Sequence, residues 1–351
     1  MMIDKERLDL YKTWFDNMSF FGHNSFILDT IEDLWNLTNY IIGKYRDFCN
    51  YNIDKNTTYT NMTKEDTITL VKHFLSNHDI NLNLEKLIED RILMLENDVF
   101  ETKDVNNFFN CKKDGFSHYD KDNKKIISIN MENTIFDGAT MVHELMHYRN
   151  QPDNKRNFIS DLLTEALSYG VELIFFEDLK DTIYHEDRSL HFKLFEKLMY
   201  NYMYRIRYIY KIILLYKRTK DINEDLYNEI FDDGDYEITM KYFDLYVQQR
   251  ECILQNTWMV IGLPLAIYIL EEYKKDHNFF NSVELFNSSL NNKSLDDCLR
   301  ALKINNQDDL KNKIKCSSNS FIESLRRLYG NWEKNEESKK PYQLEYKNLR
   351  C

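Results

Sequence analysis

The sequence predicts a mainly α-helical fold with one small antiparallel β-sheet. Gly and Pro number only eight and three among the 351 residues, so long stretches contain nothing that breaks a helix. The segment 105–130 differs, because β-favouring runs there alternate with turn signals. We therefore expect the sheet in this segment and helices elsewhere.

The expected helices follow the chain in order. They span 5–20, 25–51, 64–79, 84–98, 134–150, 157–179, 187–219, 236–256, 258–275, 294–303 and 307–329. In the remaining segment the runs Phe108-Phe109 and Ile126 to Ile129 lie around the turn signals Asp114-Gly115 and Asp122-Asn123. These runs predict the antiparallel sheet beside the helix at 134–150, with Ile126 to Asn130 as its edge strand.

The length allows one large domain or two lobes with a substantial core. We expect an N-terminal helical region over 1–100 and a second region over 101–351, or one continuous domain. The net charge of −12 argues against a nucleic-acid partner, which would require a basic face. The basic stretch from Arg205 to Lys220 is interpreted as a solvated helix face in preference to a membrane-surface helix.

Several features predict a cytoplasmic protein without a membrane partner. The six cysteines show no Cys-x-x-Cys spacing, which is typical of thiols in a reducing compartment. The N-terminus has no apolar signal core. The most apolar run, Trp258 to Leu270, is too short to cross a bilayer and contains Gly262 and Pro264.

The most informative motif is His143-Glu144-Leu145-Met146-His147, within the helix expected at 134–150. Histidines four residues apart leave the same face of a helix, and tetrahedral zinc is commonly held by two such imidazoles and a third protein ligand. The intervening Glu144 can take a proton from an attacking water, so we expect it to be the catalytic base. The alternative is a surface helix with two solvated histidines.

Glu165, in the next expected helix, is the predicted third ligand. If the two helices form an antiparallel hairpin, His147 lies about one turn before the loop and Glu165 about two turns after it. Two His and one Glu leave the fourth position of one zinc ion open, which is typical of a catalytic site. Glu172 lies on the same helix face and can accept a hydrogen bond from a zinc-bound imidazole; a plain surface carboxylate is the equal alternative.

The residues between Ile126 and Glu172 resemble the zinc oligopeptidases of the thimet oligopeptidase and oligoendopeptidase F type. Those proteins have an extended strand, a short Asn-containing turn, the His-Glu-x-x-His helix, and a helix with Glu-x-x-Ser-x-x-x-Glu. Here the last motif contains Glu165, Ser168 and Glu172. The resemblance extends over roughly residues 60 to 325, although only the zinc motifs are specific. It implies a helical metallopeptidase fold and short peptides as substrates.

The chain departs from that family in two respects. It is shorter, because family members have a longer helical N-terminal half. They also carry a His and Tyr residues before the glycine that corresponds to Gly262, and these donate hydrogen bonds to the transition-state oxyanion. Residues 255–259 contain no His or Tyr here, so we expect Tyr242 or Tyr246 to replace them. The alternative is that both rings pack in the core.

These observations predict a zinc-dependent metallopeptidase that hydrolyses oligopeptides. A peptide would pair with the edge strand Ile126 to Asn130; an ordinary hairpin with a solvated edge is the equal alternative. Two other functions stay open. One is a dedicated protease, like a toxin or effector, that cuts one specific protein. The other is a non-catalytic helical peptide-binding protein with a vestigial zinc site. The sequence does not give the oligomeric state.

Overall fold

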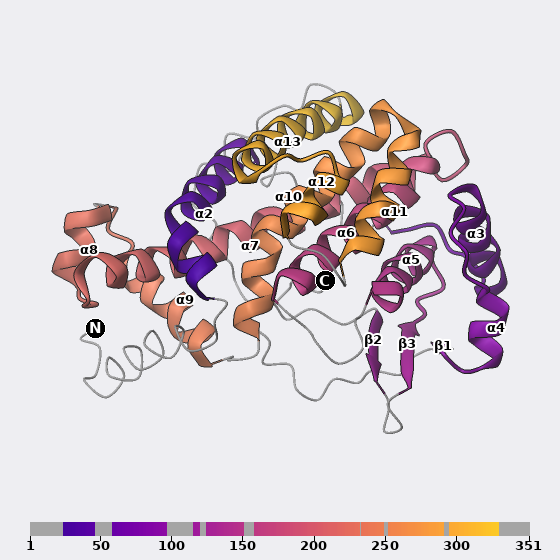
Figure 1. The fold of residues 1–351 in the computed structure, drawn as a ribbon, viewed down its shortest axis with the longest axis horizontal. Coiled ribbons are helices and arrows are strands. Elements are labelled where there is room, and N and C mark those ends of the chain that lie inside the picture. Colours follow the sequence, from indigo (N-terminus) through magenta and orange to yellow (C-terminus); the bar gives the residue numbers. More distant parts are fainter. Residues whose placement is uncertain are drawn as a thin grey trace. The chain divides into compact units, whose positions relative to one another are not determined.

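The computed structural model describes residues 24–45, 58–96, 115–119, 124–150, 158–231, 233–248, 252–290 and 295–329, and these are mainly helical, as expected (Figure 1). The α-helices are α2 (Asn24–Tyr45), α3 (Lys64–Asn77), α4 (Leu84–Glu89), α5 (Ile135–Asn150), α6 (Phe158–Asp178), α7 (His185–Thr219), α8 (Glu224–Phe231), α9 (Tyr236–Gln248), α10 (Cys252–Lys275), α11 (Phe280–Ser289), α12 (Leu295–Ala301) and α13 (Gln307–Tyr329). None of these helices is long and apolar enough to cross a membrane.

Most expected helices are confirmed to within a few residues, and the helix expected at 5–20 lies outside the described residues. The helix expected at 84–98 is wrong. It ends with α4, and Leu93–Glu96 forms a strand, β1. The reason lies at Arg91, whose φ of 53° is in the left-handed region and cannot continue a right-handed helix. The helices α8 and α11 were not expected.

The sheet has three strands in the order β1-β3-β2, where β2 is Gly115–Tyr119 and β3 is Lys125–Asn130. β2 pairs antiparallel with β3, but β1 pairs with β3 in parallel, so the expected purely antiparallel sheet is wrong. The run Ile126 to Asn130 is not an edge strand either, because β3 has a partner on each side. The expected run Phe108-Phe109 lies outside the described residues.

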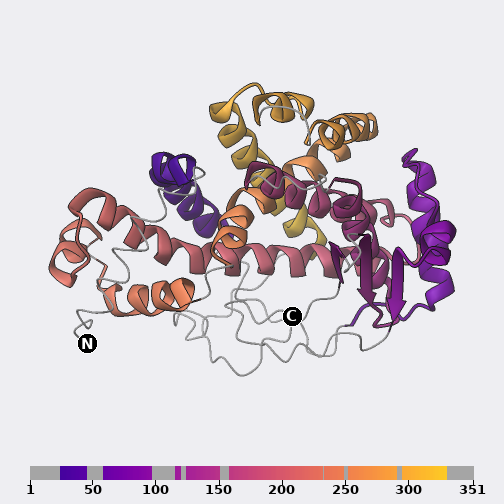
Figure 2. The ribbon, with the colours of Figure 1, turned by 60° about the horizontal axis from the view of Figure 1, so that its bottom comes forward.

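The chain forms two compact units that do not divide at residue 100. The first contains α2, α7 from Leu198, α8, α9 and α10 up to Val260. The second contains the sheet, α3 to α6, the first part of α7, and the chain from Ile261 onward. The long helix α7 therefore belongs to both units (Figure 2). Since each unit is assembled from segments far apart in sequence, composition alone did not show the boundary.

In the first unit, the charged side chain of Lys211 is buried among aromatic rings. Its ammonium donates to the Tyr227 hydroxyl at 3.0 Å and pairs with Asp233 and, at 3.3 Å, with Asp235. It also lies 6.0 Å from the centre of the Trp35 ring. A buried ammonium needs such partners, because an unpaired charge in the interior is costly.

In the second unit, α5 packs against β2, β3, α3 and α6 (Figure 1). Gly138 permits the close approach of α5 to α6, because a Cβ there would lie 3.1 Å from the Phe175 ring. This glycine, a residue that disfavours the helical conformation, therefore has a packing role.

The turn before α5 is fixed by its own polar groups. Asn133 adopts a left-handed φ of 59°, a conformation that Asn tolerates better than most residues. Asp137, in the first turn of α5, accepts hydrogen bonds from the backbone N–H groups of Glu132 and Thr134 at 3.0 and 3.1 Å. These bonds hold the helix start in a defined place after β3.

Candidate metal centre

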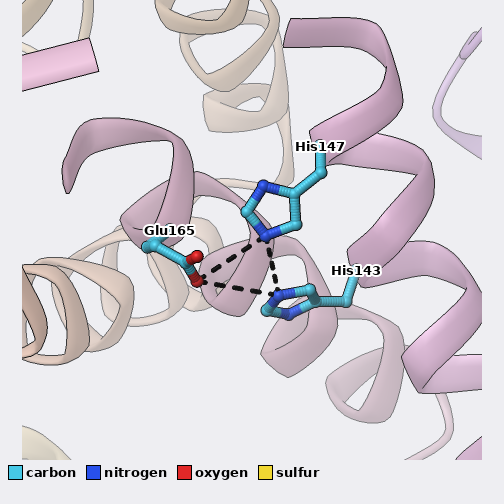
Figure 3. Close-up of side chains that lie close together, drawn as sticks. All are labelled: His143, His147 and Glu165. Carbon is cyan, nitrogen blue, oxygen red and sulfur yellow. Dashed lines mark hydrogen bonds and ion pairs between the residues drawn. The ribbon is translucent and has the colours of Figure 1, made fainter. Parts of the chain in front are cut away.

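The two histidines of the motif and Glu165 converge between α5 and α6 (Figure 3). His143 Nε2 lies 3.0 Å from His147 Nε2, and Glu165 Oε2 lies 3.8 Å from the first nitrogen and 3.6 Å from the second. The three side chains predicted as ligands therefore lie together. They are the one group of three His, Cys, Asp or Glu residues within the described ranges whose ligand atoms lie close enough to hold a metal ion together.

The two helices run antiparallel at this place. Residues that advance along α5 meet residues that recede along α6: Gly138 faces Phe175, His143 contacts Glu172, and His147 lies near Glu165. The antiparallel hairpin on which the prediction for Glu165 depends is thus present. The hairpin places a residue of α6 opposite each successive turn of α5 in this region.

The donor set fits a zinc ion. Bonds of about 2.1 Å at tetrahedral angles place two ligand atoms about 3.4 Å apart, and the three separations here lie on both sides of that value. Two imidazoles and one carboxylate are a common zinc set with room for a further ligand. All three side chains are largely shielded from solvent, Glu165 the least, with 25% of its side chain exposed.

Glu172 lies in the position predicted for it. Its Oε2 is 2.8 Å from His143 Nδ1, and the residue is buried, so the alternative of a plain surface carboxylate is wrong. Burial raises the pKa of Glu172, but the hydrogen bond from His143 and the neighbouring His191 imidazole outweigh it and lower the pKa to about 2. Glu172 accepts a hydrogen bond from the Nδ1–H of His143, so Nε2 is the nitrogen that would bind a metal after losing its own proton.

The electrostatics of the ligands follow from the same contacts. Burial alone would lower the pKa of His143, yet the hydrogen bond and negative charge of Glu172 raise it to about 9 in the absence of an ion. Burial raises the pKa of Glu165, but the neighbouring His147 makes the net shift downward. The centre therefore carries negative charge that a divalent cation can neutralise.

Glu144 is buried on α5 next to the ligands, and it lies close to strand β2. A Cβ built on Gly115 would come within 3.0 Å of Glu144 Cγ. Gly115 was expected in a turn but is the first residue of this strand. The base predicted from the motif is thus enclosed by the sheet on one side.

The two tyrosines proposed as oxyanion donors belong to the first unit. Tyr242 is buried and stacks on Tyr208, with ring centres 5.0 Å apart and planes 6° apart, which agrees with the packing alternative. Tyr246 lies on α9, and its side chain is outside the described residues. A role for either as a donor stays a prediction.

Sequence reasoning did not single out three residues around the centre. Tyr169 of α6 packs edge-on against His143, with ring centres 4.5 Å apart. His191 of α7 lies 3.2 Å from Glu172, and Tyr59 lies 3.0 Å from His191. Tyr169 could have been found, because it lies four residues after Glu165 on the same helix face. His191 and Tyr59 are too far away in sequence for any local pattern to indicate them.

Comparison with known protein families, with curated proteins and with solved structures finds no match to this chain.

Proposed function

We propose that this protein is a zinc-dependent metallopeptidase that hydrolyses peptide bonds, with oligopeptides as its substrates. The observation that carries the proposal is the convergence of His143, His147 and Glu165 next to the buried Glu144. This is the arrangement in which a His-Glu-x-x-His helix performs hydrolysis. The resemblance to the thimet oligopeptidase type of enzyme supports the same proposal through the motif at Glu165 and Glu172.

His143, His147 and Glu165 would hold the ion. When bound, zinc supplies a Lewis acid that polarises the scissile carbonyl and makes water more acidic. Glu144 accepts a proton from the water that attacks the carbonyl carbon. As the C–N bond breaks, Glu144 passes that proton to the leaving amine, so the carboxylate is regenerated at the end of the cycle.

Substrate would bind along β2, which replaces β3 as the proposed edge. Among the described strands only β3 pairs with β2, so the other side of β2 is an edge in this part of the chain. β2 begins at Gly115, against Glu144. A peptide added to this edge would use backbone hydrogen bonds, which suit many sequences, and would run close to the base.

Tyr169 is our candidate for the hydrogen-bond donor to the developing oxyanion. It shares the helix face of Glu165, and its ring is fixed against His143 and, with ring centres 5.8 Å apart, against Phe195. A phenol donates at neutral pH and has a long reach. Because no His or Tyr occupies 255–259, a donor from α6 would replace the family's residues.

The test is to measure zinc content and the cleavage of a mixed pool of quenched fluorescent peptides by the whole protein. Glu144→Gln is the matched variant, since Glu144 is not a ligand. We expect it to keep zinc while turnover falls by at least about two orders of magnitude, the usual range for loss of a general base.

Three other results would contradict the proposal in different ways. Cleavage of one intact protein with no peptide turnover would indicate a dedicated protease. Stoichiometric zinc with no cleavage of any substrate would indicate a binding protein with a vestigial site. A wild-type protein that binds no zinc would remove the metallopeptidase proposal altogether.

A further inference from the structure

A chain of buried polar side chains extends from the metal centre beyond Glu172. Glu172 contacts His143 through Oε2 and His191 through Oε1, at 2.8 and 3.2 Å. The other nitrogen of His191, Nδ1, lies 3.0 Å from the Tyr59 hydroxyl. Four residues from four separate segments are thus connected in one line that ends at a metal ligand.

A carboxylate oxygen accepts hydrogen bonds and an imidazole N–H donates them, which orders the donors in this line. Glu172 accepts from His143 Nδ1 at Oε2, and its Oε1 faces the Nε2 of His191 at 3.2 Å. With its proton on Nε2, the His191 ring accepts at Nδ1 from the Tyr59 hydroxyl. Every proton in the line therefore points toward Glu172.

The surroundings of His191 hold its Nε2 toward Glu172. Its Nε2 is fully buried and has no hydrogen-bond partner within the described part of the chain, and the carboxylate that it faces is Glu172, 3.2 Å away. Its ring stacks on Phe176 with centres 4.0 Å apart and planes at 16°, which fixes the ring orientation. A buried polar atom aimed at a carboxylate, on a clamped ring, is a means of holding that carboxylate in place.

Tyr59 is held equally firmly. The next residue, Thr60, donates through its backbone N–H and its hydroxyl to the two oxygens of Asp187, both at 2.7 Å. The Thr60 carbonyl accepts from the N–H of Ile135, at the start of α5, at 3.0 Å. The Tyr59 ring also stacks on Phe136, with centres 5.1 Å apart. The segment before α3 is therefore tied both to α7 and to the helix of the motif.

We infer that His191 and Tyr59 are positioning residues of the metal centre, which act through Glu172 to fix the orientation and tautomer of His143. This inference rests on the proposed function and names residues that the motifs do not contain. Outer partners of zinc-bound histidines typically change metal affinity by about 10- to 100-fold when they are removed. His191 acts one step further out, so we expect about a tenfold effect.

The structure offers a matched control in the same unit. His78 Nε2 lies 2.7 Å from Asp178, whose other oxygen accepts from the Tyr273 hydroxyl at 2.6 Å. The His78 ring packs on Phe280 with centres 4.1 Å apart. The same three kinds of group occur here, although the carboxylate lies between the histidine and the tyrosine, and these interactions involve none of the three proposed ligands. A substitution in either network would lower the stability of the protein. A loss of metal affinity is expected only from a substitution in the line that ends at His143.

The experiment measures zinc affinity by chelator competition and the visible absorption spectrum of the cobalt-substituted protein. His191→Leu removes the donor to Glu172, and His191→Gln restores an amide N–H. We expect about tenfold weaker zinc binding and a changed cobalt spectrum for Leu, substantial recovery for Gln, and a smaller loss for Tyr59→Phe. His78→Leu should lower the unfolding temperature without changing either metal readout.

Unchanged zinc affinity and an unchanged spectrum in folded His191→Leu would overturn the inference, and so would an equal effect of His78→Leu. If His191→Leu does not fold, the same two readouts are taken on His191→Gln and Tyr59→Phe. Wild-type zinc affinity and a wild-type cobalt spectrum in Tyr59→Phe would then overturn the inference. A wild-type protein without zinc affinity is a different result, because it overturns the proposed function itself.

Discussion

Glu144 lies against Gly115, the first residue of β2, so closely that a Cβ on the glycine would be 3.0 Å from Glu144 Cγ. It would also lie 2.8 Å from Thr140 Cγ2, a separation that real Cβ atoms essentially never show. The proposed base and the proposed substrate strand are thus in direct contact. A single methyl group tests whether that contact matters.

Gly115→Ala should displace Glu144 or push β2 away from α5, and either shift should lower peptide turnover by about tenfold or more, because misplacement of about 1 Å can be that costly. Zinc content should stay at the wild-type value, since the three atoms nearest to the new methyl group belong to Thr140, Glu144 and Ile129, none of which is a proposed ligand. Gly43→Ala is the control: it lies in α2, with nothing within 4 Å of the new methyl group. Equal turnover of both variants would contradict a role for this contact.

His147→Ala should lose zinc and activity together, with turnover reduced by at least about a hundredfold, because two ligands hold an ion far less well than three. The measurement is zinc content after gel filtration, alongside turnover. His73→Ala serves as the control, since His73 is exposed on α3 and bonded to Asn77. Retention of zinc by His147→Ala would place the ion elsewhere.

Three Phe substitutions identify the oxyanion donor. Tyr169→Phe should reduce turnover by about tenfold or more while zinc content and peptide affinity stay constant. Tyr242→Phe should have little effect on turnover, because stacking on Tyr208 already accounts for its ring. Tyr246→Phe tests the other candidate from the sequence. Wild-type turnover in all three variants would mean that the centre works without a tyrosine donor.

Acid should weaken the first unit through Asp233. Burial raises the pKa of this carboxyl, but the hydrogen bond from Lys211 outweighs it, so the net shift is downward from the ordinary 3.8. A group whose pKa is lower in the folded state contributes stability above its unfolded pKa and loses it as the pH falls through the folded value. Urea unfolding of wild type and Asp233→Asn should therefore differ at neutral pH and converge below pH ~3.8. A constant difference across that range would contradict the assignment.

The residues of the candidate metal centre could be predicted because their arrangement depends on local spacing in the sequence. The i, i+4 spacing of His143 and His147 determines their common face, and a short loop leaves few places for Glu165. The contact between Glu172 and His191 could not be predicted, because His191 belongs to another helix. Nothing in the spacing of Tyr59 or His191 indicates that they meet.

The sheet was predicted less well, and β1 shows why. Residues 84–96 contain no Gly or Pro, and the left-handed residue that follows α4 is Arg91, in a backbone conformation that sequence rarely reveals. Parallel pairing of β1 with β3 joins residues such as Leu93 and Ile127 that are distant in the chain. Once β1 is missed, β3 is mistaken for an edge. A local sequence pattern therefore predicts β3 as a strand but not the strands that pair with it.

The antiparallel pairing of α5 with α6 means that an ion would act as a cross-link between two helices. Its binding energy would then be part of the free energy of folding, and the melting temperature would depend on the free zinc concentration. Zinc at a hundred times its dissociation constant would stabilise the native state by about 2.7 kcal/mol, and a strong chelator would remove that contribution. The free zinc concentration would thus affect both the fraction of this protein that stays folded and its rate of peptide hydrolysis.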